Sequence, residues 1–180
     1  MAVFSTSGVD APVRKIADHA GVGVGTVYRH FPQRADLIAA VFRREIDACA
    51  DAASVLSMKH DPSEALGKWL QRYAAFIATK RGLATALHSG DPAFDSLPAY
   101  FEQRLQPALQ QLLQVAADAG HVRSDIDADE LLTAVASLCR SADKDGAAYA
   151  RRMVALLIDG LRYGATINDG APITSPKRRF

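Results

Sequence analysis

The stretch Gly21–Phe31 reads GVGVGTVYRHF, with a glycine at every second position and then a run of aromatic, basic and imidazole side chains. Two structures fit such a stretch: a glycine-rich loop that binds phosphate, or the turn and second helix of a helix-turn-helix. A nucleotide-binding GxGxxG follows a strand and has a third glycine. Here the preceding residues have a helical pattern and Thr26 occupies that third position, so the stretch favours the helix-turn-helix.

The residues around the glycines support two short helices. An apolar set at helical spacing predicts the first helix: Val13, Ile16, Ala17 and Ala20. Ala17 is small where the helices would cross, Gly21 can adopt the positive φ of a tight turn, and Val27 brings the second helix back onto the first. The second helix is predicted from Val24 to about Phe31, because Pro32 ends it.

The rest of the chain shows helical periodicity and capping signals. Helices are predicted at about 34–57, 62–81, 97–119, 127–140 and 147–163. The sequence therefore predicts an all-α protein, with a helix-turn-helix head at residues 1–44, a helical effector-binding and dimerisation body at residues 45–168, and a disordered tail at residues 169–180.

Composition and charge narrow the function classes. The chain has 180 residues, of which 49% are apolar and 23% charged, values typical of a soluble globular domain. No signal peptide or membrane-spanning run is apparent, and two cysteines are too few for a disulfide framework, so we expect a cytoplasmic protein without membrane contact. Six basic residues against two acidic ones between Pro12 and Arg44 suggest a polyanionic partner for the head.

The segment APVRKIADHAGVGVGTVYRHFPQRADLIAAVF resembles the DNA-binding segment of the TetR (tetracycline repressor) family of bacterial transcriptional regulators. The matching positions include Ile16–Ala17, Ala20–Val22, Thr26, Tyr28, His30–Phe31, a basic residue at 34 and Leu37. The resemblance implies a homodimer that binds a double-stranded DNA operator and a small-molecule effector. Beyond residue 42 it extends only to the order and length of the helices.

The resemblance implies a role for individual residues of the head. Arg14 would reach base edges or phosphates, Val24, Gly25 and Tyr28 would meet bases, and Thr26, His30 and Arg34 would hold phosphates. Val24 and Gly25 have no side-chain hydrogen-bonding group, so base discrimination is expected to rest on Arg14, Tyr28 and Arg29. The alternative for Tyr28 and His30 is that they are partly buried core residues with a solvated tip.

The family's DNA-binding unit begins with a full helix that packs across the other two. Here only MAVFSTSG precedes VDAPVRK, and Val3 and Phe4 match the end of that helix. Without the helix, Ile16, Val27 and Phe31 lose a packing partner, and burial of each is worth roughly 1.5–3 kcal/mol. We therefore expect a first helix that is largely missing, which weakens DNA binding.

Aromatic residues in the body fit either an effector pocket or an ordinary core. The pocket prediction comprises Trp69, Arg72, Tyr73, Phe76, His88, Phe94 and Phe101. The last two helices are apolar and rich in alanine, which fits either a dimer interface or closure of the monomer's core. The interface prediction, favoured by the resemblance, comprises Leu131, Val135, Leu138, Met153, Leu157 and Leu161.

Other chemistries are not supported. An EF-hand starting at Asp125 would need glycine at 130 and glutamate at 136, where the chain has Glu130 and Ala136. Helix capping by Asp127 explains these acids. No metal site, cofactor or catalytic motif is expected, so the chain is not predicted to be an enzyme. Cys49 and Cys139 are expected to be buried residues rather than oxidant sensors.

The sequence thus predicts a ligand-responsive DNA-binding transcriptional regulator, a repressor that binds a palindromic operator as a homodimer. The alternative is a dimeric small-molecule-binding or interaction protein whose truncated head no longer binds DNA.

Overall fold

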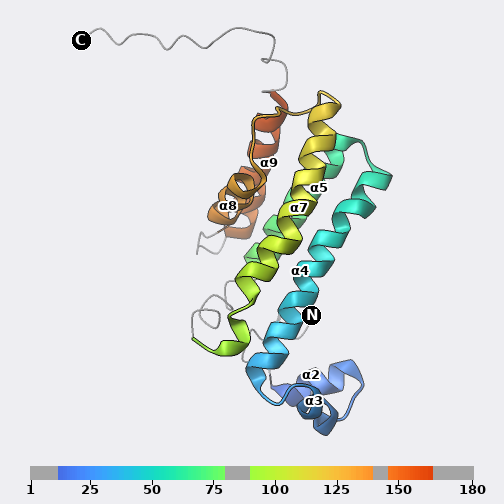
Figure 1. The fold of residues 1–180 in the computed structure, drawn as a ribbon, viewed down its shortest axis with the longest axis vertical. Coiled ribbons are helices and arrows are strands. Elements are labelled where there is room, and N and C mark those ends of the chain that lie inside the picture. The colour runs from blue at the N-terminus through green and yellow to red at the C-terminus, as the bar shows by residue number, and fades with distance from the viewer. Residues whose placement is uncertain (1–11, 80–89, 140–145, 164–180) are drawn as a thin grey trace, which may run out of the picture.

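A small pair of helices lies at one end of a longer helical bundle (Figure 1). The computed structural model describes residues 12–79, 90–139 and 146–163. Its elements, in chain order, are α2 (Val13–Ala20), α3 (Val24–His30), α4 (Arg34–Lys59), α5 (Pro62–Thr79), the short 3-10 helix η2 (Pro92–Phe94), α7 (Leu97–Asp118), α8 (Ala128–Leu138) and α9 (Gly146–Tyr163). The predicted all-α fold is confirmed.

The head consists of α2, α3 and the turn between them. Gly21 adopts a φ of 67°, and the amide of Val22 donates to the carbonyl of Ala17 at 3.0 Å. This is a glycine-terminated helix end, in which the left-handed residue satisfies the last carbonyls. Ala17 and Val27 are buried together with Leu37, so the predicted crossing of the two helices is confirmed.

Helix α4 connects the head to the body. At its start the amide of Gln33 donates to the Asp36 carboxylate at 3.0 Å, in a reciprocal capping arrangement that fixes the first turn. Leu37 belongs to the head's core, whereas Ile38 and Phe42 belong to the body's. The two cores therefore meet within the first turns of one helix, and the division near residue 44 stays a prediction.

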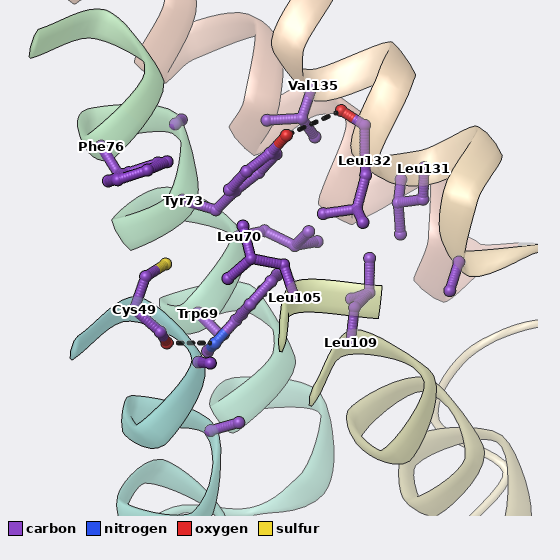
Figure 2. Packing of buried hydrophobic residues seen from close by; sticks show 14 of the residues in the cluster. Cys49, Trp69, Leu70, Tyr73, Phe76, Leu105, Leu109, Leu131, Leu132 and Val135 are labelled. Atoms are coloured by element: carbon purple, nitrogen blue, oxygen red, sulfur yellow. Dashed lines mark hydrogen bonds between the residues drawn. The ribbon is translucent and has the colours of Figure 1, made fainter. Parts of the chain in front are cut away.

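The body is built around α5, which packs against α4, α7, α8 and α9. Trp69, Leu70 and Tyr73 on α5 are almost completely buried. Figure 2 shows Tyr73 reaching from α5 to α8, where its hydroxyl donates to the carbonyl of Leu132 at 3.3 Å. The indole of Trp69 donates to the carbonyl of Cys49 at 2.9 Å. Both polar groups of the buried aromatic residues thus have partners.

Polar contacts join α4 to α7 at the edge of this core. The hydroxyl of Tyr100 donates to the Asp47 carboxylate at 2.6 Å, and the guanidinium of Arg104 donates to the same oxygen at 2.7 Å. Arg104 also pairs with Asp51 at 2.8 Å. The Tyr100 hydrogen bond and the nearby Arg104 charge hold the pKa of Asp47 below its ordinary value.

The predicted ends of the later helices agree with the structure. Pro62 is the first residue of α5, and Gly120 follows α7 with a φ of 69°. The carboxylate of Asp127 accepts from the amides of Asp129 and Glu130 at 2.8 and 3.1 Å, so the predicted cap is confirmed. The predicted missing first helix, the helix break near Arg81 and the disordered tail lie outside the described residues.

Candidate nucleic-acid interface and effector pocket

The outer face of α3 carries half of the residues predicted to meet DNA. Gly25, Tyr28, Arg29 and His30 are exposed there, and Arg14 is exposed on α2. Tyr28 keeps 51% of its surface accessible. The alternative in which Tyr28 and His30 are partly buried core residues is therefore wrong.

Val24, Thr26 and Arg34 are half-buried. Val24 packs against the core of the head, so only part of its side chain is directed outward. Arg34 occupies the first position of α4, where backbone amides point out of the helix end and favour an anion. The three residues border the exposed face of α3 rather than forming its centre.

Gly25 lies inside α3, although neither packing nor backbone conformation requires a glycine at this position. A Cβ atom added at this position would meet nothing within 4 Å, and its φ is not positive. Glycine costs roughly 0.5–1 kcal/mol relative to alanine in a helix. A close approach by a molecule outside the chain would explain why this cost is retained.

Most of the residues predicted for the effector pocket belong to the core. The Trp69 and Tyr73 rings stack with centroids 5.7 Å apart, and Phe76 continues the contact at 6.4 Å from Tyr73. Trp69, Phe76 and Phe94 are at most 8% exposed, and none of them lines a groove given by the described residues. For these three, burial favours the alternative of an ordinary core, and their place in an effector pocket stays a prediction.

A groove is nevertheless present between α5, α7 and α8, and it encloses about 620 Å³. Two predicted pocket residues, Tyr73 and Phe101, line it. Sequence reasoning missed the others: Ile77, Glu102, Asp129, Leu132, Thr133, Ala136 and Ser137. Burial of Tyr73 raises the pKa of its hydroxyl, and that hydroxyl donates to the carbonyl of Leu132.

Arg72, a polar residue predicted for the pocket, does not line this groove. Arg72 is exposed on α5 and donates to the carbonyl of Ala48 on α4 at 3.1 Å. It lines a different groove, between α4 and α5. Its assignment to the aromatic pocket is therefore wrong, and His88 lies outside the described residues.

The predicted dimer interface also needs correction. Leu131, Val135 and Leu161 are at most 3% exposed and pack in the chain's own core, so they have no surface to offer a partner. Leu138, Met153 and Leu157 are half-buried. Burial of an amphipathic helix against its own bundle explains the error, because the most regular apolar positions face inward.

A second row of residues on α9 is exposed except at Met153, which is half-buried. We call this row the α9 stripe: Tyr149, Met153, Leu156, Gly160 and Tyr163. Its spacing of alternately four and three residues is that of a helix-packing seam. Leu156 is 65% and Tyr163 is 76% exposed. The buried residues Ala150, Val154 and Leu161 repeat with the same spacing, so the period in the sequence did not separate the stripe from the core.

Three further findings concern chemistry other than DNA binding. Among the described residues, no cluster of histidine, cysteine, aspartate and glutamate side chains is suited to a metal ion. Cys49 and Cys139 are both buried, as expected. Within those same residues, no helix is long and apolar enough to cross a membrane.

Family models match both parts of the chain. The model described as "Bacterial regulatory proteins, tetR family" matches residues 1–41. The model described as "Transcriptional regulator SbtR-like, C-terminal domain" matches residues 61–163. The two matches correspond to the head with the start of α4, and to the body from α5 to α9.

Individual proteins are similar as well. A TetR transcriptional regulator from Streptomyces coelicolor has a crystal structure with a TM-score of 0.75 and 38% identity, covering 89% of this chain and 93% of that one. A TetR regulatory protein from Mycobacterium vanbaalenii gives 0.66 and 32%, covering 89% of each chain. The transcriptional repressor KstR of Mycobacterium tuberculosis is 42% identical over 59 residues, 31% of this chain and 27% of that protein. The match therefore spans about a quarter of that curated relative.

Proposed function

The chain belongs to the TetR family of bacterial transcriptional regulators, and on that premise we propose that it is a ligand-responsive repressor that binds a palindromic operator as a homodimer. Regulators of this family bind operator DNA as dimers and bind small-molecule effectors. The observation that carries the proposal is the outer side of α3, where Gly25, Tyr28, Arg29 and His30 are all exposed.

This face has the properties that a major-groove helix needs. Tyr28 and Arg29 offer hydrogen-bonding groups to base edges and phosphates. The missing side chain at Gly25 lets the backbone of α3 approach the floor of the groove. Arg14 on α2 and the N-terminus of α4 at Arg34 lie where the flanking phosphates would be held. The basic balance of the head strengthens each of these contacts.

Dimerisation is proposed to use the α9 stripe. Tyr149, Leu156 and Tyr163 are exposed large apolar side chains on one side of one helix, and Gly160 has no neighbour within 4 Å of an added Cβ atom. A two-fold interface brings one such stripe against its copy. The pair then presents two heads to two half-sites of the operator.

The alternative of a binding protein with a defective head is not favoured. The tetR family model extends through residues 1–41, and the turn and crossing of α2 and α3 are well formed. No described feature of the head indicates a loss of its DNA-binding face.

Fluorescence anisotropy with duplexes from the chain's own promoter region tests DNA binding. We expect saturable binding that exceeds binding to a scrambled duplex by at least about a thousandfold and that weakens steeply with salt. Equal affinity for both duplexes, or affinity independent of salt, would reject the proposal.

The dimer is tested separately by light scattering after size-exclusion chromatography. Leu156→Glu places a charge within the α9 stripe and is expected to shift the molar mass from dimer to monomer. Met58→Glu is the matched control, because Met58 is 78% exposed on α4, away from α9, and this variant should remain a dimer. A dimer that is unaffected by Leu156→Glu would place the interface elsewhere.

A further inference from the structure

Three grooves in the described part of the body differ in the charges that line them. The groove between α5 and α9 carries Glu64 and Asp159 together with Lys68 and Arg162. The groove between α4 and α5 carries Asp51 together with Lys68 and Arg72. The groove between α5, α7 and α8 carries Glu102 and Asp129 without a basic residue. The charged side chains that line this groove are therefore all negative.

The base of this acidic groove is apolar and aromatic. Tyr73 is 1% exposed and forms its buried end, where it lies between α5 and α8 (Figure 2). The ring of Phe101 approaches that of Tyr73 at 6.1 Å and that of Phe76 at 6.3 Å. Such a base offers an apolar surface to the body of a ligand.

The two carboxylates at the groove are available to a ligand. In the ranges that the structure describes, no ion pair is formed by Glu102 or by Asp129. The carboxylate of Asp129 accepts one hydrogen bond from the side-chain amide of Gln106, at 3.1 Å. Glu102 comes from α7 and Asp129 from the first turn of α8. Both helices therefore contribute a negative charge to the lining of the groove.

We propose that this groove binds an organic cation with an apolar or aromatic body, and that ligands of this class are the effectors of the regulator. The carboxylates favour positive charge and the apolar base favours an apolar body, so the two properties of the groove together select this ligand class. A neutral ligand would lose the charge interaction, and an anion of the same shape would be repelled. The effector role rests on the proposed function, whereas binding of the cation does not.

A ligand series with one skeleton and three charges tests the class. Isothermal titration calorimetry would compare 4-phenylbutylamine, 4-phenylbutanol and 4-phenylbutyrate at neutral pH on the full chain. We expect the amine to bind about five- to tenfold more tightly than the alcohol, as two partly exposed charge pairs would give, and the carboxylate to bind most weakly. Equal binding of the three, or tighter binding of the alcohol or carboxylate, would overturn the proposal.

Substitutions of the two carboxylates test whether the cation binds in this groove. The double variant Glu102→Gln with Asp129→Asn is expected to remove the preference for the amine and to leave binding of the alcohol unchanged. Glu130→Gln is the matched control, because Glu130 is an exposed acid of the same helix turn that does not line the groove. Circular dichroism checks that each variant is folded. A preference that survives the double variant, or that Glu130→Gln removes, would overturn the assignment.

Adding operator DNA separates this inference from the proposed function. If the regulator binds its promoter duplex and 4-phenylbutylamine weakens that binding in the wild type but not in the double variant, both stand. DNA binding that no amine changes would overturn the effector class and leave the repressor proposal intact. Amine binding without any operator binding would contradict the proposed function while retaining the ligand class of the groove.

Discussion

The head and the body of this chain are stabilised on different scales. Among the described residues, the head's core consists of Ala17, Val27 and Leu37, whereas the body's core runs continuously from α4 to α9. The head directs most of the side chains of α3 outward, and the body directs the large aromatic residues of α5 inward. A substitution in the body should therefore change stability, and a substitution in the head should change DNA binding.

The largest effect is expected in the body. Trp69→Ala removes a fully buried indole and should lower the free energy of unfolding by about 3–5 kcal/mol, as measured by urea denaturation. Trp69→Phe keeps the contact with Tyr73 and should cost less. A loss below about 1 kcal/mol for the alanine variant would show that this core is not tightly packed.

Overpacking the core of the head should disrupt the head without changing the stability of the body. Ala17 is completely buried, so Ala17→Leu should strain the crossing of α2 and α3 by about 1–3 kcal/mol. We expect loss of DNA binding by anisotropy without a change in the thermal transition of the body. Ala20→Leu, at an exposed position of the same helix, serves as the control. A variant whose body also melts earlier would show that the two cores unfold together.

Gly25→Ala sharpens the comparison, because it should affect stability and binding in opposite directions. The added methyl group meets no neighbouring atom within 4 Å, so the head should become more stable by up to about 1 kcal/mol. Amide hydrogen exchange in α3 would detect that change. Affinity for operator DNA should fall, since the methyl group faces the groove. Unchanged affinity would contradict the role given to this glycine.

The smallest effect concerns the contacts between α4 and α7. Tyr100 and Arg104 hold the pKa of Asp47 below its ordinary value, so Asp47 stabilises the fold above the unfolded pKa, near 4, and this contribution disappears as pH falls through the lower, folded pKa. Asp47→Asn should be less stable than wild type at pH 7, and the difference should shrink as the pH approaches 3.

Urea unfolding at several pH values measures this difference. Glu45→Gln is the control, because Glu45 lies on the same helix and takes no part in the described bonds to α7. This variant should not reproduce the pH dependence. A difference between Asp47→Asn and wild type that is constant with pH would reject the assignment.

The head was largely predictable from sequence because local signals determine it. Gly21, Pro32 and the spacing of Ala17 and Val27 specify a turn, a helix end and a crossing within a short segment. Exposure of Tyr28 and His30 could not be decided in the same way, since both residue types occur in partly buried positions. The solvent-facing side of α3 became clear only when its packing against α2 and α4 was known.

The helices of the body could be predicted from the sequence, but the faces that they bury or expose could not. Leu131, Val135 and Leu161 follow the helical period as strongly as interface residues would, yet they face the chain's own core. Arg72 lies one position from Tyr73 in sequence and lines a different groove. Long-range packing decides which side of a helix contacts which neighbour, and these contacts cannot be predicted from the helical period alone.

The salt dependence of operator binding tests the central claim, that the exposed face of α3 holds DNA. Arg29→Ala removes one positive charge from the α3 face of each head, so it should weaken operator binding and reduce the slope of log affinity against log salt concentration by about two. Arg151→Ala removes an exposed charge from the body and should leave the slope unchanged. Equal slopes for wild type and Arg29→Ala, or a change produced by Arg151→Ala instead, would contradict the account.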